Sequence, residues 1–218
     1  MVLRLMLPVI ATAIVFAGWG VENIASFFSQ APRPLALLAL VVGLPFAPPT
    51  TKFQLAVRAE AQHQALLAPL VNLGAAASMF AFPYLDTHRQ VASVLLIDSA
   101  AMRWVGLILF ALGFALLVWA RQQLGRWFTP RIAIHVDHEL IERGPYSLLR
   151  HPFYTGLLTA CLGFPAVFGS WAGIISVGLL LPVILFRIRV EERLLEAEFG
   201  ERYRVMVGRT KRLVPFFY

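Results

Sequence analysis

Long apolar segments alternate with short polar ones along most of this chain. A helix needs about 20 consecutive apolar residues to span the hydrocarbon core of a bilayer. The polar segments divide the apolar residues into six stretches, each expected to form a helix: Leu5–Phe28, Leu35–Phe46, Ala65–Leu85, Trp104–Ala120, Phe153–Phe168 and Trp171–Phe186. Leu35–Phe46 is short and has prolines around it, so we expect a tilted or broken span. The last two stretches are also short, and only Gly169-Ser170 separates them, which predicts a helical hairpin.

The region after this hairpin is charged and amphipathic from Arg187 to Tyr218. Its first part, Arg187–Phe199, is predicted to be one helix that leaves the membrane and ends at Gly200. The predicted fold class is therefore all-α: a polytopic integral membrane protein with about four spanning helices, a C-terminal transmembrane helical hairpin and an interfacial amphipathic tail. We expect residues 1–120 to form the N-terminal membrane helices, and residues 121–218 to form the region that carries the chemistry.

Composition and charge support a membrane protein. Of the 218 residues, 59% are hydrophobic and 14% are charged, whereas a soluble domain has about 25% charged residues. The net charge of +7 does not indicate a nucleic-acid partner, because the basic residues flank apolar segments. When the polar stretch Arg121–Pro152 and the tail are both cytoplasmic, only Arg33, Arg89 and Arg103 of the 19 basic residues fall outside. The positive-inside rule thus predicts that both termini and the site face the cytoplasm.

The stretch from Gly144 to Gly156 holds the first candidate chemistry. Pro152 fits the first turn of a helix, which puts Arg150 and His151 at its N-terminus. A helix N-terminus attracts anions, Arg150 adds a fixed charge, and His151 can be a donor or a base near neutral pH. Gly156 allows a planar ring or a backbone to approach closely. The alternative is that Arg150 and His151 only extend toward water at the membrane interface.

A pair of carboxylates, Glu191 and Glu192, lies within two turns of the last apolar segment. Adjacent residues point about 100° apart on a helix, so one carboxylate can face inward while the other orients a neighbour. Arg187 is four residues before Glu191 and is expected on the same side. Carboxylates in this place suit an amino group, a ribose diol or a general base. The alternative is a solvated interfacial helix whose charges pair with one another.

Two histidines, His135 and His138, flank Asp137 and superficially suggest a metal site. A third ligand with suitable spacing is absent from the sequence, so no metal is expected.

Three motifs in a fixed order carry a family resemblance. They are Leu124-Gly125-Arg126-Trp127-Phe128-Thr129; then Gly144-Pro145-Tyr146 with Arg150-His151-Pro152, Tyr154 and Gly156; then Glu191-Glu192 with Phe199-Gly200 and Tyr203. Over roughly Arg121 to Pro215, the chain resembles the isoprenylcysteine carboxyl methyltransferase family and its phospholipid methyltransferase relatives.

This resemblance implies an all-helical membrane enzyme that uses S-adenosylmethionine near the cytoplasmic face. It also implies roles for individual residues. The implied cofactor-binding residues are Tyr146, Arg150, His151, Pro152, Tyr154, Gly156, Glu191 and Glu192. The implied catalytic residues are Arg187, Arg189 and Glu191, with Arg187 or Arg189 orienting an anionic group of the substrate. Aromatic faces such as those of Tyr146 and Tyr154 can stabilise a sulfonium.

The methyl acceptor is expected to be a lipophilic small molecule or lipid that enters from the bilayer. The arginines after the hairpin favour a carboxylate of the prenylcysteine type, while a phospholipid amine, a small thiol and an isoprenoid carboxylate stay open. Membrane sterol reductases with a nicotinamide cofactor are a competing class, but their Arg-His element is typically followed by Asn-Tyr rather than Pro-Phe-Tyr. A non-enzymatic membrane scaffold or transporter subunit is the other alternative, although the polar residues gather at one boundary instead of lining a path at mid-depth.

Overall fold

The computed structural model of the chain describes residues 12–13, 24–43, 71, 73–75, 99–128 and 139–214. These residues are mainly helical, and the pairing of β type within them is one isolated bridge between Leu149 and Lys211. The helices, in chain order, are α2 (Ile24–Phe28), α3 (Pro32–Gly43), α6 (Ala100–Leu124), η6 (Gly125–Trp127), η7 (Gly144–Ser147), α7 (Pro152–Val167), α8 (Trp171–Phe199) and α9 (Glu201–Arg209).

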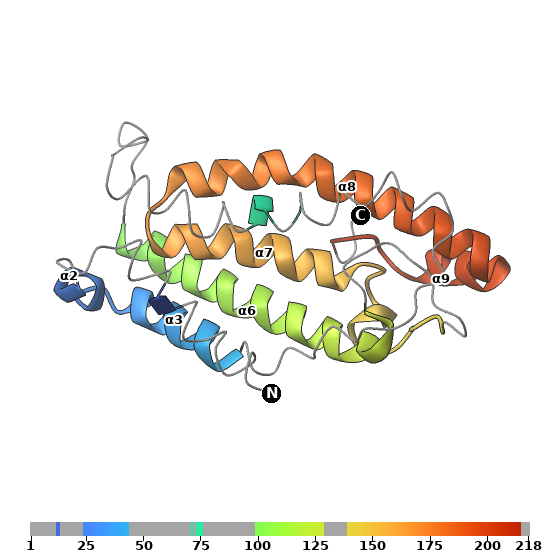
Figure 1. Cartoon of the computed structure of the whole chain (residues 1–218), viewed down its shortest axis with the longest axis horizontal. Helices are drawn as coiled ribbons and strands as arrows, with labels where there is room; N and C mark the ends of the chain where they lie inside the picture. The colour runs from blue at the N-terminus through green and yellow to red at the C-terminus, as the bar shows by residue number, and fades with distance from the viewer. Residues whose placement is uncertain are drawn as a thin grey trace.

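Three long helices form the body of the molecule. Helices α6, α7 and α8 run lengthwise beside one another, with α7 between the other two (Figure 1). Helix α3 packs on α6 near one end of the bundle, and α9 follows α8 at the other end (Figure 1). The most extensive contact in the described part of the chain is that between α6 and α7.

Glycines allow α6 and α7 to touch backbone to backbone. A Cβ atom added to Gly113 would lie 2.5 Å from the amide nitrogen of Ala160, and one added to Gly156 would lie 2.6 Å from that of Leu117. Phe110 fills the space beside this seam, where its ring is fully buried and lies edge-on to Phe164 at 5.1 Å. The sequence allows either a planar ring or a backbone to lie close to Gly156, and the structure shows the backbone of α6 there.

Two of the described helices are long and apolar enough to cross a membrane: Ala100–Trp127 and Trp171–Phe199. At about 1.5 Å per residue, the 29 residues of α8 extend well beyond a hydrocarbon core of about 30 Å. Helix α7 has 16 residues and falls short of that thickness, as its sequence predicts. Large apolar side chains such as Leu112 and Leu179 are exposed on the outer faces of α6 and α8, which suits contact with lipid.

The predicted hairpin is confirmed, because α7 and α8 are joined by Phe168, Gly169 and Ser170. Ser170 caps α8 by accepting a hydrogen bond from the amide of Gly173 at 3.1 Å. The apolar run that ends at Phe186 and the charged helix from Arg187 form one continuous helix. This helix ends at Phe199, and Gly200 follows with a positive φ of 51°, as its place in the sequence predicts.

The other predicted segments compare as follows. The predicted helix Trp104–Ala120 is longer at both ends, because Ser99 caps it through the amide of Met102 and the helix continues to Leu124. The predicted helix Leu35–Phe46 begins earlier, at Pro32, and is described as far as Gly43. The boundary predicted between residues 120 and 121 falls inside α6. Most of Leu5–Phe28 and of Ala65–Leu85 lies outside the described residues, as do Thr129, His135, Asp137 and His138.

Candidate active site

A short turn delivers two polar residues to the start of α7. Gly144 has a positive φ of 60° and begins the 3-10 helix η7, which buries Pro145 and Tyr146. His151 then occupies the position just before α7, and Pro152 is the first residue of this helix. Both placements are as predicted from the sequence. Pro152 is tolerated there because its missing N–H has no partner in the first turn of a helix.

The carboxylate of Glu192 in α8 collects cationic side chains from two other segments. Arg150 Nε lies 3.1 Å from Glu192 Oε1, and Arg212 approaches with Nε at 3.1 Å from Oε1 and Nη2 at 2.7 Å from Oε2. His151 Nε2 is 3.4 Å from Oε1, which adds an ion pair only when the imidazole is protonated. Two permanent positive charges therefore surround one largely buried negative charge.

Arg150 also binds groups of its own chain beyond Glu192. Its Nη1 donates to the carbonyl oxygens of Val207, at 3.1 Å, and Thr210, at 2.7 Å. The guanidinium thus ties the end of α9 to the start of α7. The sequence predicts that the charge of Arg150 binds a ligand. In the structure, Arg150 makes three hydrogen bonds within the protein itself.

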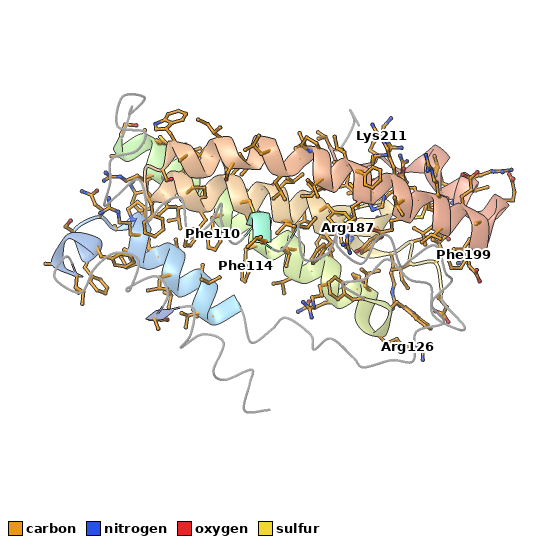
Figure 2. The ribbon with its side chains drawn as sticks, turned by 45° about the horizontal axis from the view of Figure 1, so that its top comes forward. Phe110, Phe114, Arg126, Arg187, Phe199 and Lys211 are labelled. Carbon is orange, nitrogen blue, oxygen red and sulfur yellow. The ribbon has the colours of Figure 1, made fainter. Side chains whose placement is uncertain are left out.

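A second cluster lies on the neighbouring side of α8. The Tyr154 hydroxyl donates to Glu191 Oε2 at 3.0 Å and accepts from Arg187 Nε at 2.5 Å. Arg187 is buried, with 6% of its surface exposed, and lies between α8 and the beginning of α7 (Figure 2). The predicted meeting of Arg187 and Glu191 is therefore made through the Tyr154 hydroxyl. Glu191 and Glu192 face different partners, as their 100° separation predicts.

Two buried phenols flank these carboxylates. Burial, and then the charge of Glu191, raise the pKa of Tyr146 well above its usual value. Burial, and then the charge of Glu192, likewise raise the pKa of Tyr203. Both phenols are therefore neutral donors at physiological pH. The hydroxyl of Tyr203 and Nε2 of His151 are buried without a hydrogen-bond partner among the described residues.

The first motif of the sequence packs against the same end of α7. The guanidinium of Arg121 lies 4.4 Å from the centre of the Phe128 ring, and that ring is 5.0 Å from Phe153 in the first turn of α7. Arg126 stacks on Trp127 at 4.2 Å. Aromatic and cation–π contacts of this kind hold the end of α6 against the polar cluster.

Most of the predicted site residues come together, and three have other surroundings. Those that converge are Tyr146, Arg150, His151, Tyr154, Arg187, Glu191 and Glu192. Arg189 is exposed on α8, Gly156 faces the backbone of α6, and Pro152 is buried at the start of α7. The sequence does not predict that Arg212 belongs to this cluster. Arg212 is 20 residues from Glu192, and no helical spacing connects the two.

Part of the chain is similar to a known protein family. Residues 101–202 match the profile of the family described as "Phospholipid methyltransferase". This match takes in almost all of α6, the whole hairpin and the start of α9. It ends before Arg212.

Individual proteins are also similar to this chain. A protein of Oryza sativa subsp. indica named "Probable protein-S-isoprenylcysteine O-methyltransferase" is 32% identical over 52% of this chain and 61% of its own length. "Protein-S-isoprenylcysteine O-methyltransferase B" of Arabidopsis thaliana is 28% identical over 71% of this chain and 75% of its own length. A solved structure of the eukaryotic intramembrane Ras methyltransferase ICMT aligns with a TM-score of 0.48, 19% identity and coverage of 98% of this chain and 93% of the other.

The matches to the family profile and to the curated relatives confirm the resemblance predicted from the motifs. The chain is similar to methyltransferases of the phospholipid and isoprenylcysteine type. It spans about three fifths of the length of the rice relative, 61%.

Proposed function

We propose that this protein is a membrane-embedded methyltransferase that transfers a methyl group from S-adenosylmethionine to a lipophilic acceptor. The observation that carries the proposal is the meeting of Arg150, His151 and Tyr154 at the start of α7 with Glu191 and Glu192 of α8. All five residues lie within the segment that matches the methyltransferase family. They gather beyond the apolar part of the bundle, where a water-soluble donor and a lipid-soluble acceptor can meet.

The hydrogen-bonding groups of this cluster suit the polar groups of S-adenosylmethionine. Glu191 uses Oε2 to accept from Tyr154, and its Oε1 has no donor among the described residues, so it can accept from an amino group or a ribose hydroxyl. The Tyr203 hydroxyl is a buried polar atom without a hydrogen-bond partner in the described part of the chain, and His151 Nε2 is likewise buried without a hydrogen bond, although Glu192 Oε1 lies 3.4 Å away. Such atoms gain a hydrogen bond when a polar ligand binds.

In the methyl transfer, the main task of the protein is to position the reacting atoms. S-adenosylmethionine supplies an activated methyl group on a sulfonium sulfur, and a nucleophile must approach in line with the bond that breaks. Holding the reacting atoms in this geometry is a large part of the rate enhancement. The buried Tyr146 and Tyr154 have aromatic rings, which can stabilise a cationic sulfur.

For the acceptor we favour a carboxylate of the prenylcysteine type, oriented by Arg187. This arginine is buried and already aligned by Tyr154, whereas Arg189 is exposed, so Arg187 is the better of the two predicted candidates. A carboxylate is deprotonated at neutral pH and needs no general base. We place the site and both termini on the cytoplasmic side, because the basic residues gather there.

A phospholipid amine is the second candidate acceptor. It is favoured by the description of the matching family and by Glu191, whose carboxylate suits an amine and can take up its proton.

Methyl transfer from a labelled donor tests this function. The purified protein in lipid nanodiscs is incubated with S-adenosylmethionine tritiated on the methyl group and with one of three acceptors. These are N-acetyl-S-farnesylcysteine, phosphatidylethanolamine and a small alkyl thiol. We expect label in a base-labile methyl ester of the farnesylcysteine. Label in the phospholipid headgroup would favour the second candidate, and no labelled product together with no binding of S-adenosylhomocysteine would contradict the proposal.

A further inference from the structure

The C-terminal segment lies across the start of α7. In this segment, residues 210–213, which we call the strap, the amide of Lys211 donates to the carbonyl of Leu148 at 3.0 Å. In the other direction, the amides of Arg150 and His151 donate to the carbonyls of Lys211, at 2.7 Å, and Arg212, at 3.2 Å. The strap therefore occupies two amides that precede α7, a place where the sequence predicts attraction of an anion.

The strap is also fixed at its far end. The Thr155 hydroxyl donates to the carbonyl of Leu213 at 2.7 Å, and the Leu213 side chain is buried in the cluster that contains Tyr154 and Ile188. With contacts on both sides of it, the backbone of Arg212 has a defined position. Its side chain can then present a guanidinium in a fixed direction.

The Arg212 guanidinium meets Glu192 in a two-pronged arrangement. Its Nη2 lies 2.7 Å from Oε2, and its Nε lies 3.1 Å from Oε1. This bidentate contact sets the orientation of the carboxylate as well as its charge balance. Arg150 contacts Glu192 through Nε alone and uses Nη1 for backbone carbonyls. Without Arg212, Glu192 Oε2 loses the cationic group that lies 2.7 Å away.

We propose that Arg212 is a positioning residue of the methyl-donor site, which acts by holding the Glu192 carboxylate, and that the strap is a third component of this site beside α7 and α8. This inference rests on the proposed function. It goes beyond the family match, because that match ends at residue 202. Arg212 itself does not need to touch the donor, so its removal should act through Glu192.

A double-mutant cycle on donor binding tests this inference. The affinity of the full-length protein in nanodiscs for S-adenosylhomocysteine is measured by calorimetry for wild type, Arg212→Gln, Glu192→Gln and the double variant. We expect Arg212→Gln to weaken binding roughly tenfold. Glu192→Gln should weaken it at least as much, and the double variant should bind no more weakly than Glu192→Gln. In steady state, the KM for the donor should rise while the KM for the acceptor stays constant.

Two further variants separate positioning from folding. Arg212→Lys keeps the charge but loses the two-pronged contact, so it should bind more weakly than wild type and more tightly than Arg212→Gln. If Arg212→Gln does not fold, the comparison of folded Arg212→Lys with wild type is the test, and equal binding would overturn the role of Arg212. Arg204→Gln is the matched control, because Arg204 forms an exposed pair with Glu196 at 2.9 Å, and it should bind like wild type.

The outcomes distinguish this inference from the proposed function. Binding by Arg212→Gln within about twofold of wild type, or an effect that adds fully to that of Glu192→Gln, would overturn the role of Arg212 and leave the proposed function in place. Absence of binding by the wild-type protein would overturn both.

Discussion

Helix α7 is held by backbone contacts along its length and by polar and charged groups at its start. Along its length, α7 packs on α6 through glycines, and the contact is between backbones with little side chain between them. At its start, α7 is held by Arg150, which pairs with Glu192 of α8 and donates to the backbone carbonyl of Val207 in α9, and by backbone hydrogen bonds with the strap. The contact between α6 and α7 requires glycines, which have no side chain, whereas the contacts at the start of α7 require particular polar atoms.

The contact between α6 and α7 supports the fold, whereas the polar end holds groups that a ligand can use. The seam between α6 and α7 resists any added volume, because protein interiors are close-packed, but it offers no polar group to a ligand. The polar end offers carboxylates, a buried imidazole and phenols, and each of its ion pairs depends on residues far apart in sequence. Substitutions in the seam should therefore change stability most, whereas substitutions at the polar end should change ligand binding as well as stability.

The largest effect on stability is expected from Gly113→Ala. Its new Cβ would lie 2.5 Å from the amide nitrogen of Ala160, so the two helices must move apart. We expect a loss of about 3 kcal/mol or more, measured as a lower midpoint of thermal unfolding in detergent. Gly178→Ala is the control, because nothing lies within 4 Å of its new Cβ, and it should be neutral or slightly stabilising. Equal stability of the two variants would contradict the close contact.

A smaller effect is expected from Tyr154→Phe at the polar end. The change removes the hydroxyl between Arg187 and Glu191. We expect a loss of about 1.5–3 kcal/mol, because the hydrogen bonds involve charged groups, and a lower rate of methyl transfer. Tyr203→Phe should differ, because the Tyr203 hydroxyl has no partner among the described residues. It should leave the thermal stability of the ligand-free protein unchanged and weaken only the binding of S-adenosylhomocysteine. The reverse ranking would show that the two phenols have been assigned the wrong roles.

The smallest effect is expected from Arg204→Ala, which removes an exposed ion pair with Glu196. Water and salt screen such a pair, so neither the thermal midpoint nor methyl transfer should change measurably. A clear loss of activity would mean that the polar end extends along α9 beyond the residues described above.

The features predicted correctly from the sequence depend on local chemistry. Pro152 suits the first turn of α7, because an N–H there has no partner within the helix; Gly200 ends α8 with a positive φ, and Gly169 with Ser170 turns the hairpin. The family motifs also identified the group of residues that meets at the polar end. These signals are contained in a few consecutive residues, so the rest of the fold is not needed to recognise them.

The features that the sequence could not predict depend on tertiary packing. Arg150 and Glu192 are 42 residues apart, so nothing in their spacing indicates that they pair. Arg187 and Arg189 are two residues apart, which points them about 200° apart on a helix, and only the packing of α8 on α7 decides which one is buried. Gly156 belongs to the motif that predicts a cofactor site, but in the structure the position of its missing Cβ faces the backbone of α6. Its part in donor binding stays a prediction.

The most direct test of this account is the affinity for S-adenosylhomocysteine of three proteins: wild type, Glu192→Gln and Glu196→Gln. Both glutamates lie on α8, but Glu192 is largely buried between two arginines, whereas Glu196 is exposed beside Arg204. We predict that wild type and Glu196→Gln bind equally, and that Glu192→Gln binds roughly tenfold more weakly or worse, because a neutral amide cannot balance the charges of two partly buried arginines. Equal binding by all three proteins, or no binding by the wild type, would contradict a methyl-donor site at the start of α7.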